Sequence, residues 1–222
     1  MTKNLTKKMA IIAMFAAMSY VITVISHYLH LTIVPSVPFL TYDPKDIIIC
    51  IGGFVLGPIP ALIISIVVSF LEMITISTTG FYGFIMNIFS TCAFVIPAAL
   101  IYKTKKSFMG AILSLVTGFV SVAISMTLWN IIITPIYMGV ERTLLIKNFL
   151  WPIVIFNLVK TSVNVAAVLL LYKPIISALR AIKLVEKKEK KSDFKTTITM
   201  LTIGGILLVV SIIIWILIKN LG

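Results

Sequence analysis

Residues 149–172 read FLWPIVIFNLVKTSVNVAAVLLLY, an apolar run long enough to cross a membrane as one helix. Lys160 lies near the middle of this run, where a charge costs roughly 2.5–3.5 kcal/mol on membrane-insertion scales. Asn157, Lys160 and Asn164 are spaced i, i+3 and i+7, which places them within an arc of roughly 60° on one helix face. This polar stripe predicts a cavity or a partner inside the membrane.

Two interpretations of Lys160 are open. In the first, its ammonium group snorkels to a membrane interface and the neighbouring amides bind adjacent helices. In the second, the stripe faces a ligand cavity. Lys160 lies about eleven residues, roughly 16 Å, from the start of its expected helix. Either interface is therefore a long reach, and we favour the cavity.

The whole chain has the composition of an integral membrane protein. Of its 222 residues, 60% are hydrophobic and only 12% are charged, and the mean hydropathy is +1.14. We predict an all-α polytopic membrane protein, a six-helix bundle with an additional C-terminal transmembrane helix. The alternating strands of a membrane barrel are not seen in the sequence. The expected helices span residues 8–25, 46–56, 59–76, 83–102, 108–137, 149–172 and, as the additional helix, 197–218.

Positive charge is concentrated on alternate connections between the expected helices. The net charge is +12, from 19 Lys and Arg against 7 Asp and Glu. The basic clusters before residue 8, in 103–106 and in 173–195 fall on one side if six helices cross in alternation. The positive-inside rule then places the amino terminus in the cytoplasm. We interpret the basic balance as a topology signal with some attraction to membrane lipid, and expect no nucleic-acid partner.

The chain divides into three expected parts. Residues 1–178 form the predicted substrate-binding membrane domain, 179–196 a charged cytoplasmic linker, and 197–222 the additional transmembrane helix. That last helix would place the carboxyl terminus outside the cell. Prolines in the segment 26–45 exclude a helix there and allow a short extended or hairpin lid over a cavity.

The polar groups inside the expected helices indicate the kind of ligand. Asn130, Asn157 and Asn164 each supply a donor and an acceptor, whereas Lys160 supplies donors only. This set suits a flat ligand whose edge alternates carbonyl and N–H groups. Half of the candidate aromatic residues could equally be interfacial belt residues. The aromatic side chains able to cover the faces of such a ligand are Phe39, Tyr42, Phe81, Tyr82, Tyr137 and Phe156.

Catalytic and metal chemistry find little support in the sequence. Paired carboxylates, a nucleophile with a base and a phosphate loop are missing, so we expect no enzyme, no catalytic residue and no cofactor. Glu72 lies near the outer end of an apolar run and is interpreted as an interfacial or lid contact. His27 and His30 have a possible metal spacing, but a third ligand nearby is lacking, so we expect no metal.

Several stretches resemble the substrate-binding S components of energy-coupling factor (ECF) vitamin transporters, most closely the riboflavin-specific ones. The order and spacing of these stretches agree with those of the family over residues 8–172. The chain differs in its expected seventh helix, because S components usually have six. The similar stretches are AMFAA at 13–17, FLTYDPKD at 39–46, GP at 57–58, TTGFYG at 78–83, WN at 129–130, PIY at 135–137 and PIVIFNLVK at 152–160.

The resemblance implies a protein that binds riboflavin, as a transported ligand, from outside the cell. In this family an Asn on the fifth helix and an Asn-x-x-Lys on the sixth help to hold the flavin ring. These positions correspond to Asn130, Asn157 and Lys160, and helical phase adds Asn164. With the aromatic residues included, the candidate binding set is Asn130, Asn157, Lys160, Asn164, Phe39, Tyr42 and Tyr82.

The same resemblance implies partners. The family's Ala-x-x-x-Ala contact with the transmembrane coupling subunit (T component) corresponds to Ala13 and Ala17, whose spacing allows close packing of helices. Two cytoplasmic ATPases power such a complex. Alternatives remain: another vitamin or flavin analogue, because Lys160 could meet a carboxylate; a polytopic membrane enzyme; or a purely structural membrane partner.

Overall fold

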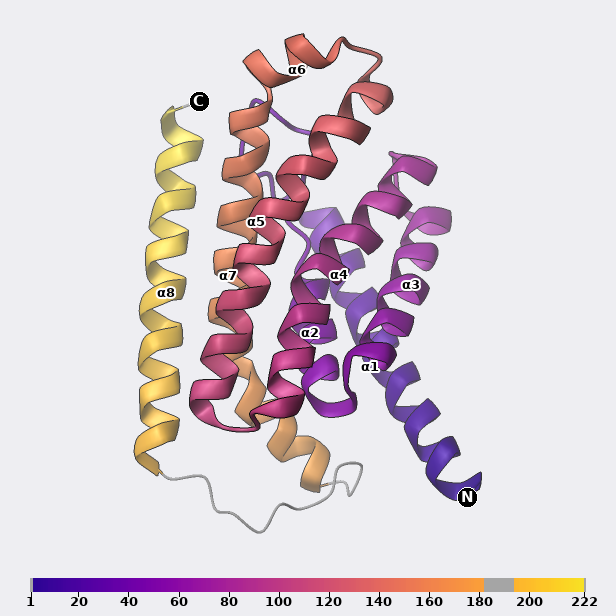
Figure 1. Cartoon of the computed structure of the whole chain (residues 1–222), viewed down its shortest axis with the longest axis vertical. Coiled ribbons are helices and arrows are strands. Elements are labelled where there is room, and N and C mark those ends of the chain that lie inside the picture. Colours follow the sequence, from indigo (N-terminus) through magenta and orange to yellow (C-terminus); the bar gives the residue numbers. More distant parts are fainter. Residues whose placement is uncertain (1, 182–193, 222) are drawn as a thin grey trace.

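A computed structural model describes residues 2–181 and 194–221, and most of these residues are helical (Figure 1). The predicted all-α architecture is confirmed. Within the described residues, six helices are long and apolar enough to cross a membrane, whereas α2 and α6 are shorter. The helices are α1 (Thr2–Leu29), α2 (Lys45–Leu56), α3 (Pro58–Thr75), α4 (Gly80–Thr104), α5 (Phe108–Met138), α6 (Arg142–Asn148), α7 (Leu150–Ala181) and α8 (Phe194–Leu221).

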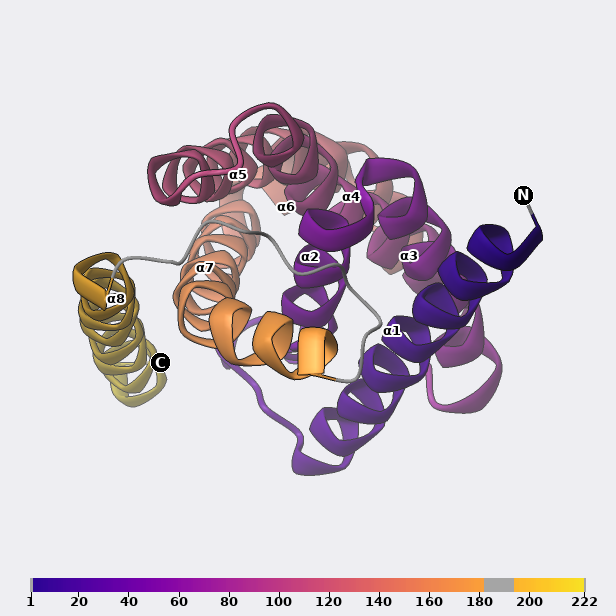
Figure 2. The same cartoon turned by 90° about the horizontal axis from the view of Figure 1, so that it is seen from below.

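Helix α2 lies inside the bundle. Seen from the end in Figure 2, it is surrounded by α1, α3, α4 and α7, and it packs against all of them. Residues 45–54 of this 12-residue helix are all buried. Because protein rather than lipid surrounds it, α2 can carry charged residues at its start, provided that the neighbouring helices supply partners.

A tight reversal joins α2 to α3. Gly57 has φ 98°, a conformation that glycine adopts without steric cost, and Pro58 occupies the first turn of α3. Proline suits that position because its missing N–H would have no partner in the first turn of a helix. The pair Gly57-Pro58 therefore ends one helix and starts the next.

Small residues let the central helices approach closely. A Cβ atom added at Gly118 of α5 would lie 2.6 Å from the backbone oxygen of Phe94 in α4, so only glycine fits this contact. Aromatic rings fill the neighbouring apolar core. The rings of Phe54 and Tyr102 stack with their centroids 4.3 Å apart, and the Tyr102 and Tyr172 hydroxyls form a hydrogen bond.

Several helix boundaries differ from the sequence predictions. Helix α1 extends beyond the predicted 8–25 at both ends, because hydropathy marks the apolar span and not the helix ends. The segment predicted to form a lid is therefore shortened to residues 30–44. Helix α7 continues through Pro174 to Ala181 and α8 begins at Phe194, so both helices enter the predicted linker 179–196. Residues 182–193 of that linker lie outside the described residues. The short polar helix α6 was not predicted, because its seven residues carry no long apolar period.

The two ends of the bundle differ in charge. The amino terminus, the α4–α5 turn with its basic residues at 103–106, and the end of α7 all lie at the lower end in Figure 1. Helix α6 and the carboxyl terminus lie at the upper end. Helix α8 packs against α7, and in Figure 2 it lies on the opposite side of the bundle from α1.

Candidate ligand-binding site

A cavity of about 370 Å³ lies at the end of the bundle opposite the basic segments. Its walls come from the α1–α2 loop, the α3–α4 turn, the start of α4, the end of α5 and the first half of α7. The volume falls in the usual range for a small-molecule site. The lining side chains that carry the argument below are Phe39, Asp43, Glu72, Tyr82, Asn87, Asn130, Tyr137, Phe156, Asn157 and Lys160.

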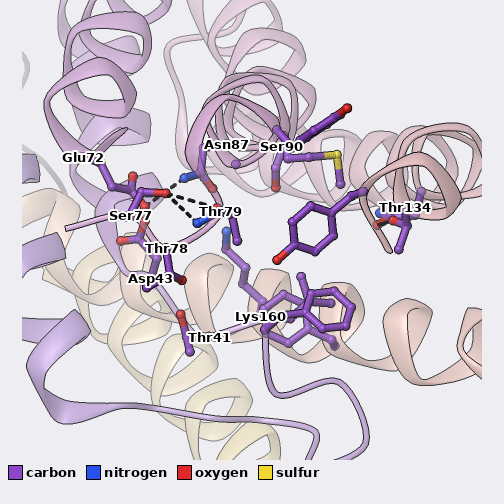
Figure 3. A pocket seen from close by; sticks show the side chains of 18 of the residues that line it. Thr41, Asp43, Glu72, Ser77, Thr78, Thr79, Asn87, Ser90, Thr134 and Lys160 are labelled. Carbon is purple, nitrogen blue, oxygen red and sulfur yellow. Dashed lines mark hydrogen bonds between the residues drawn. The ribbon is translucent and has the colours of Figure 1, made fainter. Parts of the chain in front are cut away.

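Lys160 lines this cavity and pairs with a buried carboxylate. Its Nζ atom lies 3.1 Å from Oδ2 of Asp46, in the first turn of α2. The residue is only 7% exposed. Figure 3 shows it extending from α7 into the cavity, on the side where Asp43, Glu72 and Asn87 lie. This placement excludes the snorkelling interpretation, because the ammonium group remains inside the bundle.

Asp46 joins three helices through its two carboxylate oxygens. Thr91 of α4 donates to Oδ1 at 2.6 Å, and the Asn164 amide donates to Oδ2 at 3.3 Å. Tyr42 in turn donates its hydroxyl to Oδ1 of Asn164 at 3.0 Å. A carboxylate 2% exposed is thus satisfied by an ammonium group and two neutral donors, as a buried charge requires.

A second ionic cluster forms one wall of the cavity. Lys45 forms ion pairs with Asp43 and Glu72. The Asn87 amide donates a hydrogen bond to the Glu72 carboxylate at 2.8 Å, and the Thr23 hydroxyl donates one to Asp43 at 3.1 Å. Burial alone would raise the pKa of Asp43. The positive charges of Lys45 and then Lys160 outweigh burial and lower this pKa below its usual value, so Asp43 is ionised at neutral pH.

Taken together, the carboxylates outnumber the ammonium groups. Asp43, Asp46 and Glu72 contribute −3, and Lys45 and Lys160 contribute +2, which leaves a formal charge of −1. Every ammonium group here already has a carboxylate partner. The cavity therefore offers donors and acceptors to a neutral polar ligand but no unpaired cation to an anionic one.

Two of the asparagine amides that line the cavity, Asn157 and Asn130, are oriented by their own helices. Asn157 donates to the backbone oxygen of Ile153 at 2.8 Å, and Asn130 donates to that of Met126 at 2.7 Å. Each bond uses one amide hydrogen. The other amide hydrogen and lone pairs of the carbonyl oxygen can still pair with a ligand, although Thr134 shares the Asn130 oxygen at 2.8 Å.

Aromatic side chains complete the outer part of the cavity. The Tyr137 ring lies 6.0 Å from those of both Phe39 and Tyr82, measured between centroids. Phe39 belongs to the α1–α2 loop, Tyr82 to α4 and Tyr137 to α5, so rings from three elements meet here. Together with Phe156 of α7 they can cover the faces of a flat ligand.

The sequence-predicted residues separate into three groups. Asn130, Asn157, Lys160, Phe39 and Tyr82 are brought together around the cavity. Tyr42 and Asn164 are not among the lining residues and instead form hydrogen bonds behind Lys160. Ala13 and Ala17 are exposed on α1 and are not among the residues that line the cavity.

The charged partners of Lys160 and Lys45 were missed from the sequence. Asp43, Lys45 and Asp46 follow one another in the stretch DPKD, immediately before an apolar helix, and such a cluster is itself a signal. Glu72 was interpreted as an interfacial or lid contact, but it lines the cavity. His27 and His30 also line it, and among the described residues no group of three potential ligands could hold a metal ion.

A comparison with protein families shows which family the chain belongs to. The family model for the substrate-specific component of ECF transporters matches residues 7–172. The chain belongs to this family. The family consists of substrate-binding components of transporters and not of enzymes, so the S-component resemblance and the non-enzymatic assignment are both confirmed. Helix α8 lies beyond the matched residues.

Two individual proteins are similar over most of the S component. The riboflavin transporter RibU of Staphylococcus aureus (strain TCH60) is 26% identical over 182 residues, covering 79% of this chain and 94% of RibU. A solved S component of a bacterial ECF transporter superposes with a TM-score of 0.68 at 24% identity, covering 79% of this S component and 99% of that chain. The second likeness supports the fold alone.

Proposed function

We propose that this S component captures riboflavin at the cavity end of the bundle and serves as the substrate-binding subunit of an ATP-driven importer. The observation that carries the proposal is the convergence of amides, a paired lysine and aromatic rings on one cavity. Asn130, Asn157 and Lys160 face the space that Phe39, Tyr82 and Tyr137 border. The similarity to RibU supports the same ligand.

The polar wall suits the flavin ring system. Its pyrimidine edge alternates carbonyl and N–H groups, which the carbonyl and amide groups of Asn157 and Asn130 can pair with, while Lys160 donates to a carbonyl. Lys160 holds its position because Asp46 neutralises it. The faces of the ring system are covered by aromatic side chains.

The charge of the cavity favours riboflavin over a vitamin that carries a carboxylate. Both buried lysines are already paired, and the carboxylate groups leave a formal excess of one negative charge. A carboxylate ligand would meet Asp43 and Glu72 without gaining an unpaired cation. Another vitamin or a flavin analogue is the alternative ligand. The alternative that the chain is a membrane enzyme is excluded, because its family consists of substrate-binding components of transporters.

The transport role requires partners that the bundle itself does not contain. We propose that the chain is a multi-pass protein of the cell membrane, with the basic end and the amino terminus in the cytoplasm and the cavity and carboxyl terminus outside. Ala13 and Ala17 would contact the T component, and two cytoplasmic ATPases would supply the energy. The α1–α2 loop would act as the lid over bound riboflavin.

Flavin titration of the purified protein tests the proposal. Bound riboflavin absorbs blue light, so wild-type protein should purify yellow or become yellow on titration. We expect Asn157→Ala to weaken riboflavin binding by about 1–3 kcal/mol, because a polar edge of the ligand is left without a partner.

A matched control is available in α6. Asn148 is an exposed asparagine outside the cavity, and Asn148→Ala should leave the affinity unchanged. Wild-type protein that binds no flavin would contradict the riboflavin assignment. Equal riboflavin affinities in both alanine variants would contradict the placement of the ligand at Asn157.

A further inference from the structure

Helix α8 makes a specific contact with the α1–α2 loop, which lines the cavity. The indole Nε1 of Trp215 donates a hydrogen bond to the backbone oxygen of Thr32 at 3.1 Å. The Trp215 ring also lies 6.4 Å from that of Tyr42, between centroids. A helix outside the family-matched residues 7–172 thus contacts both ends of the α1–α2 loop.

The contact is made at the base of this loop. Thr32 and Thr41 form an antiparallel bridge, and the Tyr42 backbone N–H donates to the Leu31 oxygen at 2.8 Å, so the two ends of the loop are tied together. Residues 38–40, which lie between these two ends, line the cavity together with Thr41 of the bridge. Whatever holds Thr32 therefore restrains this cavity-lining stretch as well.

Apolar packing continues from α8 to the cavity wall. Trp215 and Ile218 pack against a buried cluster that joins the loop to α7. One member of the cluster, Phe156, also lines the cavity. The buried members are Ile33, Val34, Val37, Tyr42, Ile153, Phe156 and Val159. The loop base is thus enclosed between α7 and α8.

We propose that Trp215 is a positioning residue that fixes the α1–α2 loop over the cavity and slows its opening. The physical reason is the packing around the contact: the hydrogen bond is partly buried, and Trp215 packs against the buried apolar cluster. Water has reduced access to the Thr32 carbonyl there, so releasing it from the indole costs more than releasing a fully hydrated carbonyl. A helix acting only as a membrane anchor would have no need of this hydrogen bond.

Hydrogen exchange of the ligand-free protein tests this role without assuming a ligand. Trp215→Phe keeps an apolar ring and removes the indole donor. We expect the backbone amides of residues 31–42 to exchange about two- to tenfold faster, as the loss of one hydrogen bond predicts, and Trp215→Ala to show a larger effect. Amides in α3 and α5 should keep their rates.

Trp151→Phe is the matched control, because Trp151 lies on α7 with 71% of its surface exposed. It should leave exchange in 31–42 unchanged. Equal rates in wild type and both Trp215 variants would overturn the proposal. Acceleration spread evenly over all helices in both variants would also overturn it, because that result indicates general destabilisation.

A kinetic measurement extends the test and rests on the proposed riboflavin site. Riboflavin should dissociate faster from Trp215→Phe than from Trp151→Phe. The thermal unfolding midpoints of these two variants should differ little. Unchanged dissociation would overturn the gating role of Trp215. If wild-type protein binds no riboflavin, the proposed ligand fails, whereas the exchange experiment still decides the role of Trp215.

Discussion

The two ends of the bundle show how one membrane fold separates ligand recognition from structural support. In the described part of the chain, the charged residues buried most deeply, Lys45, Asp46 and Lys160, all lie at the cavity end. The opposite end is packed with apolar and aromatic side chains such as Phe54 and Tyr102. Among the residues that the structure describes, buried charge lies where neighbouring helices supply its partners, at the end that contains the cavity.

Helix α2 belongs to both regions. Its first turn carries Lys45 and Asp46 at the cavity, and its last turn places Phe54 against the aromatic residues near the basic end. Asp46 also lies at the helix N-terminus, where the helix dipole favours a negative charge. One buried 12-residue helix thus connects a polar site to an apolar base, and substitutions at its two ends should have different consequences.

The largest effect is expected for Asp46→Ala. The substitution leaves Lys160 without its carboxylate partner, and breaking a buried ion pair in this way costs about 3–5 kcal/mol. We expect thermal unfolding in detergent to occur at a much lower temperature and riboflavin binding to be lost. A stable Asp46→Ala protein would show that the pair contributes little to the fold.

A double substitution separates stability from binding in this region. Combining Asp46→Leu with Lys160→Met removes both charges and retains similar volume, which commonly preserves stability. The double variant should unfold closer to wild type than Asp46→Ala does, yet bind riboflavin poorly. Recovery of both properties would argue against a role of Lys160 in binding.

At the apolar end, Phe54→Ala should change stability without changing the site. Removal of a buried ring that stacks on Tyr102 leaves a cavity and costs about 3 kcal/mol. Thermal unfolding should report this loss, while riboflavin titration of the folded protein should give the wild-type affinity. Weaker binding in Phe54→Ala would mean that the two ends of α2 are coupled.

A smaller effect is expected for Tyr42→Phe, behind the cavity. Burial and the nearby charges of Asp46 and Asp43 raise the pKa of Tyr42, so that its hydroxyl stays protonated and donates to Asn164. Loss of this bond should reduce the free energy of unfolding by about 1 kcal/mol and weaken riboflavin binding less than Asn157→Ala does. A greater loss of affinity than in Asn157→Ala would place Tyr42 in direct contact with the ligand.

The smallest effect on the bundle is expected on the exposed face of α1. Ala13→Trp and Ala17→Trp should each change riboflavin affinity by less than about 0.5 kcal/mol, because both residues are exposed and neither lines the cavity. Uptake with the T component and ATPases should nevertheless be blocked by steric exclusion. Normal uptake by both variants would place the docking surface elsewhere, and lost binding would show that this face packs within the fold.

The sequence alone predicted the helical membrane architecture, because apolar runs of sufficient length report directly on the surrounding solvent. It also placed Asn157 and Lys160 on one face of α7, since helical periodicity fixes the relative direction of side chains within one helix. The resemblance of its motifs identified the S-component family. These features depend on local composition and spacing, which a linear sequence contains.

Only the tertiary structure decided which groups meet across helices. Asp46 pairs with Lys160, 114 residues further along the chain. Asn164 accepts a hydrogen bond from Tyr42 behind the cavity. Trp215 of α8 contacts the α1–α2 loop at Thr32. Such contacts depend on the tilt, rotation and axial position of separate helices. Periodicity within one helix leaves these quantities undetermined, because packing against the other helices sets them.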